Sequence, residues 1–493
     1  MRGLLIQCFM LKKPTPQQTE LEMVTLESLV PSDHLLRKID AHIDFDFIRD
    51  KVSHLYCLDN GRPPIDPVVL FKILCIGYLF GIRSERQLMR EIEVNVAYRW
   101  FLGLRLTDKV PDASTLSQNR RRRFVGNGIY QDIFDEIVLQ AVEAKLVDGR
   151  VLYTDSTHLK ANANKGKYDL KAVSKSRADY LEALDEDITK DRAAHGKKRL
   201  KPKPHEPVIK ESKVSRTDGD AGYMVRDGKP KGFFYLDHRT VDSKCAIITD
   251  SHATAANVHD SIPYLSRLDR QRERFGFEVD AVGLDAGYMT AGICKGLDDR
   301  EITGVIGYRR PTHRKGFLRK RQFEYLPGLD GYRCPEGQIL TYATTERGGY
   351  RHYKSDRKVC RTCPLLATCT SSANQTKIVT RHVWEEIRQR TDANRLTPWG
   401  KAIYKRRKET VERSFADAKQ LHGHRYAKLR GLAKVREQCL LAAACQNMKK
   451  IALILARNTN SWLKYLTKWR LGPLSNILKD GKSQTPAYFH MTA

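Results

Sequence analysis

The 493-residue sequence predicts a mixed α/β protein with a helical N-terminal region and a small cysteine-rich insert. Three observations predict this fold class. Apolar residues recur at helical spacing over residues 20–145. Strand-like runs then appear at 149–154, 232–241, 245–250, 279–284 and 302–308. The spans between the last three are long enough for a helix. Four cysteines gather between residues 334 and 369.

The helical region is expected to consist of short helices joined by tight turns. Candidate caps precede three of these helices: Asp66 (followed by Pro67), Ser84 with Gln87 three residues on, and Asp112 or Ser114. The third helix ends in a run of positive charge formed by Arg120, Arg121, Arg122 and Arg123. Two interpretations stay open, a helix-turn-helix-like DNA-binding module and a plain helical bundle with a solvated basic face.

The composition points to a polyanionic partner. The formal net charge is +29, the pI is about 9.6, and the excess spans the whole length. A field of this size attracts nucleic acid, the commonest large polyanion. A merely basic protein without such a partner is the alternative.

Membrane insertion and a disulfide scaffold are not expected. No apolar run reaches the ~20 residues that span a bilayer. Residues 1–19 have a short apolar stretch without a small-residue cleavage site, so we expect an unstructured leader rather than a signal peptide. The 11 cysteines are scattered or in one tight group, which favours reduced thiols in a cytosol.

Two of the expected strands are each followed by one acidic residue. Val151, Leu152 and Tyr153 lead to Asp155, and the run VDAVGL leads to Asp285. One such acid is more often a helix cap than a functional group. Two strands of one sheet that each end in an acid would bring two carboxylates to a common edge, where ligands bind in α/β sheets. Carboxylate oxygens are the ligands that Mg²⁺ prefers.

A third acid lies on an expected helix. Glu412 and Lys419 are seven residues apart, so ~700° of rotation places them on one face two turns apart. The acid could bind a metal and the lysine a phosphate. The alternative is a solvated helix face with ordinary Glu/Lys pairing. Glu409 is a weaker candidate, because position 416 is an alanine rather than a lysine.

Three motifs resemble the DDE transposases of bacterial insertion sequences: TDSTHLKA around Asp155, GLDAGY around Asp285 and ETVERSFADAK around Glu412. The N-terminal run PSDHLLRKID through PDASTLSQNRRRRF is similar to the amino-terminal domain of that group. The resemblance covers roughly residues 20–457 and implies an RNase-H-like core in which the three acids hold two divalent metals, Mg²⁺ or Mn²⁺. Two such metals can bind one phosphate and stabilise both the attacking and the leaving oxygen.

The activity implied by this resemblance is transposition. The enzyme would bind the inverted repeats at the element ends, cleave a phosphodiester, and join the freed 3′ hydroxyl to target DNA. Double-stranded DNA is the expected partner, a homodimer the expected synaptic form, and the bacterial cytoplasm, near the nucleoid, the expected location. A non-catalytic DNA-binding regulator and a metal-dependent nuclease without strand transfer are the alternatives.

One departure concerns residues upstream of Glu412. Relatives with a longer signature carry Tyr and Arg there at fixed spacing. Here Tyr404 and Arg407 lie one residue out of that phase, and Lys405 and Lys408 occupy it, so Tyr404 receives no role. DNA contacts are expected from Lys419, Arg407, Arg120, Arg121, Arg122 and Arg123.

The cysteine-rich insert could hold one Zn²⁺. Its candidate ligands are Cys334, Cys360, Cys363 and Cys369, of which the middle two form a CxxC. Four thiolates can bind Zn²⁺ tetrahedrally, although two CxxC pairs are the usual pattern. Four unligated thiols are the alternative.

The expected domain order follows from these segments: a leader (1–19), a helical DNA-binding domain (20–145), the first part of the core (146–315, with a charged insert at 160–230), the four-cysteine insert (316–380), the second part of the core with the third acid (381–457) and a basic tail (458–493).

Overall fold

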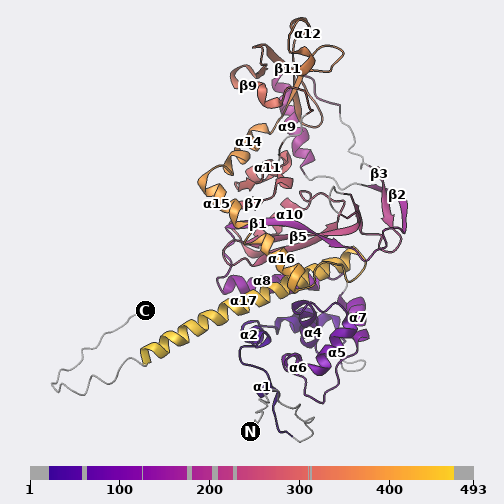
Figure 1. Cartoon of the computed structure of the whole chain (residues 1–493), viewed down its shortest axis with the longest axis vertical. Helices are drawn as coiled ribbons and strands as arrows, with labels where there is room; N and C mark the ends of the chain where they lie inside the picture. The colour runs from indigo at the N-terminus through magenta and orange to yellow at the C-terminus, as the bar shows by residue number, and fades with distance from the viewer. Residues whose placement is uncertain are drawn as a thin grey trace, which may run out of the picture.

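The computed structural model describes residues 22–57, 64–124, 126–174, 180–201, 209–225, 230–308, 310 and 314–470 (Figure 1). The expected leader lies outside these residues, and of the expected tail only the continuation of one helix lies within them. The elements follow the expected classes, helical first and mixed afterwards.

The N-terminal region consists of helices only among its described residues. They are α1 (Leu26–Leu29), α2 (Leu35–His42), α3 (Phe47–Val52), η1 (Ser53–Leu55), α4 (Pro67–Leu79), α5 (Glu85–Val94), α6 (Val96–Leu102), α7 (Ala113–Asn119), the π-helical turn η2 (Arg120–Phe124) and α8 (Ile129–Glu143). The expected caps are confirmed: the side chains of Asp66, Ser84 and Asp112 accept hydrogen bonds from the backbone at the starts of α4, α5 and α7.

The central sheet has the strand order β4-β5-β1-β7-β8. β6 also pairs with β5, beyond the residues of β5 that pair with β4. Its strands are β1 (Val151–Lys160), β4 (Gly222–Met224), β5 (Gly232–Asp242), β6 (Ile248–Ala255), β7 (Ala281–Leu284) and β8 (Thr303–Ile306). β5 is antiparallel to β1 and β6, whereas β7 is parallel to β1 and β8 is parallel to β7. All five expected strand runs are therefore confirmed.

Two strands run beyond their expected ends. β6 continues from the expected Asp250 to Ala255 along β5. β1 was expected to end at the acid, but it continues through Lys160, because β5 pairs with it up to Lys160 and Phe234. Asp155 thus lies in the middle of β1, at the point where the parallel pairing with β7 stops and the antiparallel pairing continues.

Helices cover the sheet on both sides. They are α10 (Tyr264–Phe275), η3 (Ala286–Tyr288), α11 (Ala291–Asp298), α14 (Glu385–Asn394), α15 (Pro398–Arg406), α16 (Val411–Leu421) and α17 (Leu432–Arg470). α17 lies between the central sheet and the helical region and contacts β6, α8, α2 and α4 (Figure 1). Val435, Cys439 and Leu440 are buried, and Leu432 is partly buried. One hydrophobic cluster continues from the helical region through α17 into the sheet.

By length and composition, Leu432–Asn458 of α17 is apolar enough to cross a membrane, which the sequence analysis did not expect. However, 67% of its apolar stretch is buried inside the protein. The helix has the burial of a central core helix.

The charged insert contains more structure than the expected helix and loop. β2 (Tyr168–Ser174) and β3 (Ile209–Ser215) form an antiparallel pair, and α9 (Leu181–Ala194) lies between them in sequence. α9 packs on the second sheet, where Asp191 accepts hydrogen bonds from Arg351 Nε (2.7 Å) and Thr345 Oγ1 (2.6 Å). The two inserts therefore contact each other.

The cysteine-rich insert is built around this second sheet, whose order is β13-β12-β11-β10-β9. Its elements are η4 (Lys320–Gln322), β9 (Glu324–Leu326), η5 (Pro327–Leu329), β10 (Gly331–Arg333), β11 (Ile339–Thr345), β12 (Tyr350–Lys354), α12 (Arg357–Cys360), α13 (Leu366–Cys369) and β13 (Ile378–His382). It has its own small core around Phe323, Tyr332 and Tyr353, and it lies at the end of the molecule opposite the helical region (Figure 1).

Candidate active site

Asp155 and Asp285 follow paired positions on neighbouring parallel strands. Thr154 of β1 pairs with Leu284 of β7, so the next residue on each strand is one of the two acids. Asp285 also accepts a hydrogen bond from the backbone N–H of Gly287 (2.7 Å), which begins the turn η3. Asp285 therefore caps a short helical turn, as a single acid after a strand often does, and it also lies beside Asp155.

The pKa of Asp155 reflects its burial and the carboxylates near it. Burial raises the pKa of Asp155 to about 6, against the lowering effect of Arg407, and the charges of Asp285 and Asp260 raise it further. A hydrogen bond from the backbone N–H of Ser156 (2.8 Å) favours the ionised form but does not restore the ordinary value. Negative charge is thus concentrated at this edge of the sheet.

Asp260 is a fourth acid at the site that the sequence analysis missed. It lies in the loop between β6 and α10, and its Oδ1 accepts a hydrogen bond from Ser156 Oγ (2.9 Å). No local signal separates it from an ordinary residue before a helix, because its proximity depends on how that loop folds back onto β1.

Arg407 joins the first acid to the third. Its Nη2 donates to Asp155 Oδ2 (2.8 Å), and its Nη1 lies 4.0 Å from Glu412 Oε1. The guanidinium is buried, whereas the Glu412 side chain is 48% exposed. Glu412, in the first turn of α16, therefore faces the same site as Asp155, with Arg407 between them.

The one-residue shift of Tyr404 and Arg407 relative to the longer signature is accommodated by the turn between α15 and α16. The backbone N–H of Glu412 bonds to the carbonyl of Arg407 (3.1 Å), five residues back rather than four, so one extra residue fits into the turn. Arg407 consequently reaches the acids from its shifted position. Tyr404, left without a role by the sequence, lies beside it: Arg407 Nη1 donates to its hydroxyl (3.5 Å).

A glycine keeps room for this tyrosine. A Cβ on Gly307, just after β8, would lie 2.6 Å from the Tyr404 hydroxyl oxygen and 2.9 Å from the backbone nitrogen of Ala286. Any other residue there would displace Tyr404 or the turn after Asp285.

Lys419 lies on the same side of β1 as the acids. Its Nζ donates to Thr157 Oγ1, and Thr157 is two residues from Asp155, hence on the same face of the strand. The apolar stripe of α16, formed by Val411, Phe415 and Ala418, is buried as its spacing predicts. This packing fixes which face of α16 turns toward β1.

The four arginines of the helical region do not form one exposed patch. Arg120 pairs with Glu85 (2.5 Å) and is largely enclosed, and Arg123 lies over the ring of Tyr56 at 4.4 Å. Arg121 and Arg122 are exposed. Only these two present free charge to a partner in the described part of this region's basic turn, fewer than the sequence run indicates.

The four cysteines of the insert lie near enough for three of them to affect the fourth. Cys334 follows β10, Cys360 and Cys363 flank the end of α12, and Cys369 ends α13. Burial raises the pKa of the Cys369 thiol, and the other three cysteines raise it further. All four are partly exposed and free of disulfides. Four cysteine thiolates are the kind of donor set that binds Zn²⁺ in proteins.

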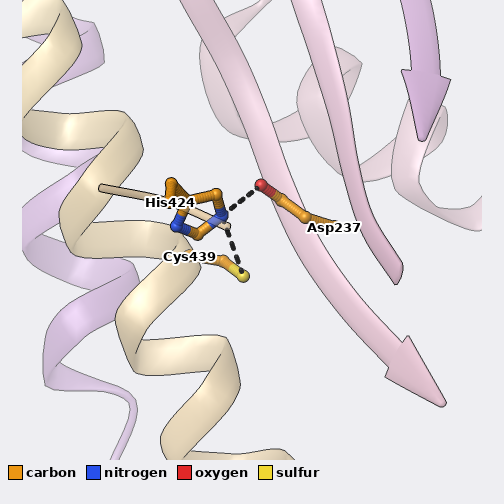
Figure 2. A group of neighbouring side chains, drawn as sticks. All are labelled: Asp237, His424 and Cys439. Atoms are coloured by element: carbon orange, nitrogen blue, oxygen red, sulfur yellow. Dashed lines mark hydrogen bonds and ion pairs between the residues drawn. The ribbon is translucent and has the colours of Figure 1, made fainter. Parts of the chain in front are cut away.

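A different group of metal-ligand type lies in the core (Figure 2). Among the described residues, ligand atoms of Asp237, His424 and Cys439 all lie within 4.8 Å of one another, whereas neither the three acids of the candidate site nor the four cysteines of the insert form such a group. His424 Nε2 lies 2.9 Å from Asp237 Oδ2 and 3.9 Å from Cys439 Sγ.

This buried group is an ion-pair network rather than a metal site. Asp237 also accepts hydrogen bonds from Arg239 Nε (2.8 Å) and Ser251 Oγ (3.1 Å). Arg239, fully buried, already neutralises the carboxylate, and Arg239 and His424 hold the pKa of Asp237 low against burial. A divalent cation would add charge to a balanced site next to a guanidinium, at a high cost in the interior.

Two segments of the chain match families of transposases. Residues 24–122 match the family described as Transposase domain (DUF772), and residues 333–452 match the family described as Transposase DDE domain. Both matched segments are therefore of transposase type. Together the two matches support a DDE transposase of the insertion-sequence type, which confirms the resemblance drawn from the motifs.

Similar solved structures include the piggyBac transposase synaptic complex with hairpin DNA, at 11% identity over 92% of this chain and 87% of that one, with a TM-score of 0.32. Two Mos1 transposase paired-end complexes follow at 12% identity and a TM-score of 0.16. The complex with the left transposon end covers 50% of this chain and 61% of that one, and the complex with Mn covers 52% and 64%. Similarities of this size carry no argument about function. No curated protein matches the chain.

Proposed function

We propose that this transposase cleaves DNA phosphodiesters at the site formed by Asp155, Asp285 and Glu412, and joins the freed 3′ hydroxyl to target DNA. The observation that carries the proposal is the pairing of Thr154 with Leu284, which brings two acids from distant parts of the chain to adjacent positions. The ion pairs of Arg407 with Asp155 and Glu412 add the third acid.

The strand arrangement supports an RNase-H-like core. β6, β5 and β1 form an antiparallel set, and β7 and β8 continue the sheet parallel to β1. This order matches the core that the resemblance to DDE transposases implies, with the first acid on the central strand and the second after the next strand.

The donor set fits two divalent cations, Mg²⁺ or Mn²⁺. Hard cations prefer carboxylate oxygens, and burial, with the neighbouring charges of Asp285 and Asp260, raises the pKa of Asp155 in spite of Arg407. Asp155, Asp285 and Glu412 would hold the ions, which, when bound, polarise the scissile phosphate and stabilise charge on the attacking and leaving oxygens.

The protein's own groups position the phosphate. Lys419 of α16, which bonds Thr157 two residues along β1 from the first acid, could neutralise a phosphate oxygen, and Arg407 could do so once released from Asp155. No enzyme nucleophile is needed. Water attacks phosphorus and the bond to the 3′ oxygen breaks, which frees a 3′ hydroxyl. That hydroxyl then attacks a target phosphodiester in the same site, and the bond from the target phosphorus to its own 3′ oxygen breaks, so that the target strand leaves with a 3′ hydroxyl.

The remaining assignments extend this proposal. The helical region, with Arg121 and Arg122 exposed, would bind the inverted repeats at the element ends. Cys334, Cys360, Cys363 and Cys369 would hold one Zn²⁺. A homodimer would bring two ends together, in the bacterial cytoplasm at the nucleoid.

The acids provide the test. Asp155→Asn, Asp285→Asn and Glu412→Gln are each expected to reduce Mg²⁺-dependent cleavage of end-containing DNA more than about 100-fold, since loss of groups that merely support metal ligands costs 10–100-fold. DNA binding should be retained, as measured by gel shift without metal. Exposed Glu143→Gln on α8 is the matched control.

Normal cleavage by any one of these variants would remove that residue from the site. Wild-type protein that binds ends without cutting them would favour the non-catalytic regulator. Cleavage without joining of pre-cut ends to a plasmid would favour the nuclease.

A further inference from the structure

A second nucleic-acid contact lies beyond the end of β1, around Tyr426. The segment after α16 joins the sheet there: the backbone N–H of Lys160 bonds to the carbonyl of Arg425 (3.2 Å), and the N–H of Ala427 bonds to the carbonyl of Lys160 (2.8 Å). Tyr426 is therefore held by main-chain hydrogen bonds to the strand that carries Asp155, and its position does not depend on a mobile loop.

The Tyr426 side chain remains 43% exposed although its neighbour Ala427 is buried. It belongs to none of the hydrophobic clusters of the described residues. Packing of the core thus does not explain an aromatic residue at this position.

Two cations from different parts of the chain face its ring. Arg83, from the turn between α4 and α5, has its Cζ 4.9 Å from the ring centroid, and Lys160 Nζ lies at 5.8 Å. Both residues are exposed. The helical region and the sheet therefore contribute one positive charge each to the same aromatic side chain.

A polar hollow of about 440 Å³ opens beside Tyr426. Its polar lining comes from Asn162, Asn164, Thr217 and Arg430. Arg430 is held there by a hydrogen bond from its Nε to the carbonyl of Asn162 (3.0 Å). Amide and guanidinium groups of this kind can hydrogen-bond base edges and phosphates.

The nearby acids do not cancel this positive charge. Asp218 accepts hydrogen bonds from the Tyr235 hydroxyl (2.7 Å) and the backbone of Gly431 (3.1 Å), and Asp220 accepts one from the backbone of Leu432 (2.9 Å). Both carboxylates thus stabilise the start of α17 rather than pair with Arg83 or Lys160.

We infer that Tyr426, Arg83 and Lys160 form a binding site for an unpaired nucleotide of the DNA substrate, with the base on the tyrosine ring and its phosphates on the two cations. Exposed aromatic residues among cations bind single-stranded DNA through stacking and backbone charge. This inference rests on the proposed function, because that function makes DNA the substrate.

The site lies at a defined distance from the acids. Lys160 is five residues beyond Asp155 on one strand, which at ~3.3 Å per residue is about 16 Å. Lys419, bound to Thr157, lies on the way. A DNA strand with its scissile phosphate at Asp155 would therefore place an unpaired nucleotide a few positions away at Tyr426.

The test compares two synthetic DNA probes with the full-length protein in EDTA: a blunt duplex, and the same duplex with a short single-stranded extension that carries 2-aminopurine. We expect the extended probe to bind more tightly and its fluorescence to be quenched. Tyr426→Ala should weaken binding of the extended probe about tenfold, within the range for loss of one stacked base, and leave the blunt duplex unchanged. Tyr426→Phe should bind like wild type.

Tyr350→Ala is the matched control, since this tyrosine is 42% exposed on β12 in the other sheet. Equal binding of the two probes by wild type, or equal losses for both probes in Tyr426→Ala, would overturn the inference. Asp155→Asn should keep the preference for the extended probe while losing cleavage. A cleavage-competent Asp155→Asn protein would refute the proposed function without changing the Tyr426 result.

Discussion

At the scale of single residues, the candidate site holds more carboxylates than cations. Asp155 and Glu412 pair with Arg407, and Asp285 and Asp260 lie near enough to act on Asp155, whose pKa burial and these charges raise to about 6 in spite of its ion pair. Lys419 of α16 adds a positive charge nearby, where it bonds the hydroxyl of Thr157, two residues along β1 from Asp155. Such an imbalance is costly unless a further cation is bound.

Glu437 allows a direct test of buried charge elsewhere in the core. It lies on α17 and is 7% exposed, and burial raises its pKa to about 7 from 4.5, although Arg120 and Lys434 lower it. The folded protein thus holds the proton more tightly than the unfolded chain does. The free energy of unfolding should therefore fall as the pH rises from about 4.5 to about 7, by up to about 3 kcal/mol.

Glu437→Gln removes this ionisation. We expect the variant to be about 1–3 kcal/mol more stable than wild type at pH 8 and nearly equal to it at pH 4.5, in guanidinium unfolding followed by circular dichroism. Exposed Glu143→Gln should change stability at neither pH. A difference between Glu437→Gln and wild type that is the same at both pH values would contradict the assignment.

Sequence patterns identified residues whose role depends on local order. Asp155 and Asp285 stood out because each follows a short apolar run, and Asp66, Ser84 and Asp112 because caps precede helices. Asp260 and Tyr426 carry no such pattern, since their surroundings come from segments distant in sequence. Arg407 was expected to contact DNA, whereas its contact with Asp155 depends on a five-residue hydrogen bond that spacing alone does not reveal.

At the scale of elements, β1 shows why strand ends are hard to predict. The polar run after Thr154 suggests an end, but Thr157, Leu159 and Ala161 still point inward because β5 supplies hydrogen bonds as far as Lys160. The pairing partner, about 80 residues away, decides the length of the strand.

Arg239 connects three elements beneath the candidate site. It is the cross-strand partner of Asp155 in the β1–β5 register, and its Nη1 bonds to Ser414 Oγ on α16 (3.2 Å) and Gln446 Oε1 on α17 (2.5 Å). Its guanidinium also lies over Phe415, 5.2 Å from the ring centroid. α16, which carries Glu412, is thereby tied to the sheet.

Arg239→Met should cost about 3–5 kcal/mol of unfolding free energy, because it leaves Asp237 charged in the core with His424 as its remaining ionisable partner. The measurement is guanidinium unfolding. Arg239→Met combined with Asp237→Leu should recover much of the loss, since an apolar pair can replace a buried ion pair. A single variant that loses less than about 1 kcal/mol would show that the network does not hold α16.

At the scale of the whole molecule, the helical region and the sheet share one hydrophobic core, which α17 completes. The sequence indicated the change from helix to strand near residue 145. It could not indicate that residues 432–458 fill the space between the two parts, because no local pattern specifies which surface an apolar helix covers. The strand order likewise depends on pairing across inserts of about 70 residues.

The cysteine-rich insert has a separate core and allows a separate test. We expect purified protein to contain one equivalent of zinc and Cys363→Ser less than half an equivalent, by metal analysis, because three thiolates bind zinc more weakly than four. The variant should also expose the second sheet to limited proteolysis while the rest stays resistant. Cys57→Ser, an exposed cysteine outside the insert, is the control. Less than half an equivalent in wild type would argue against the site.

The position of α17 has a consequence for where such an enzyme would cut. Because this helix packs at once on α2, α4 and α8 and on β6, the surface that would read an element end and the carboxylates that would break the strand belong to one rigid body. The number of base pairs between the recognised sequence and the broken bond would then be set by the dimensions of the protein and not by the length of a flexible linker.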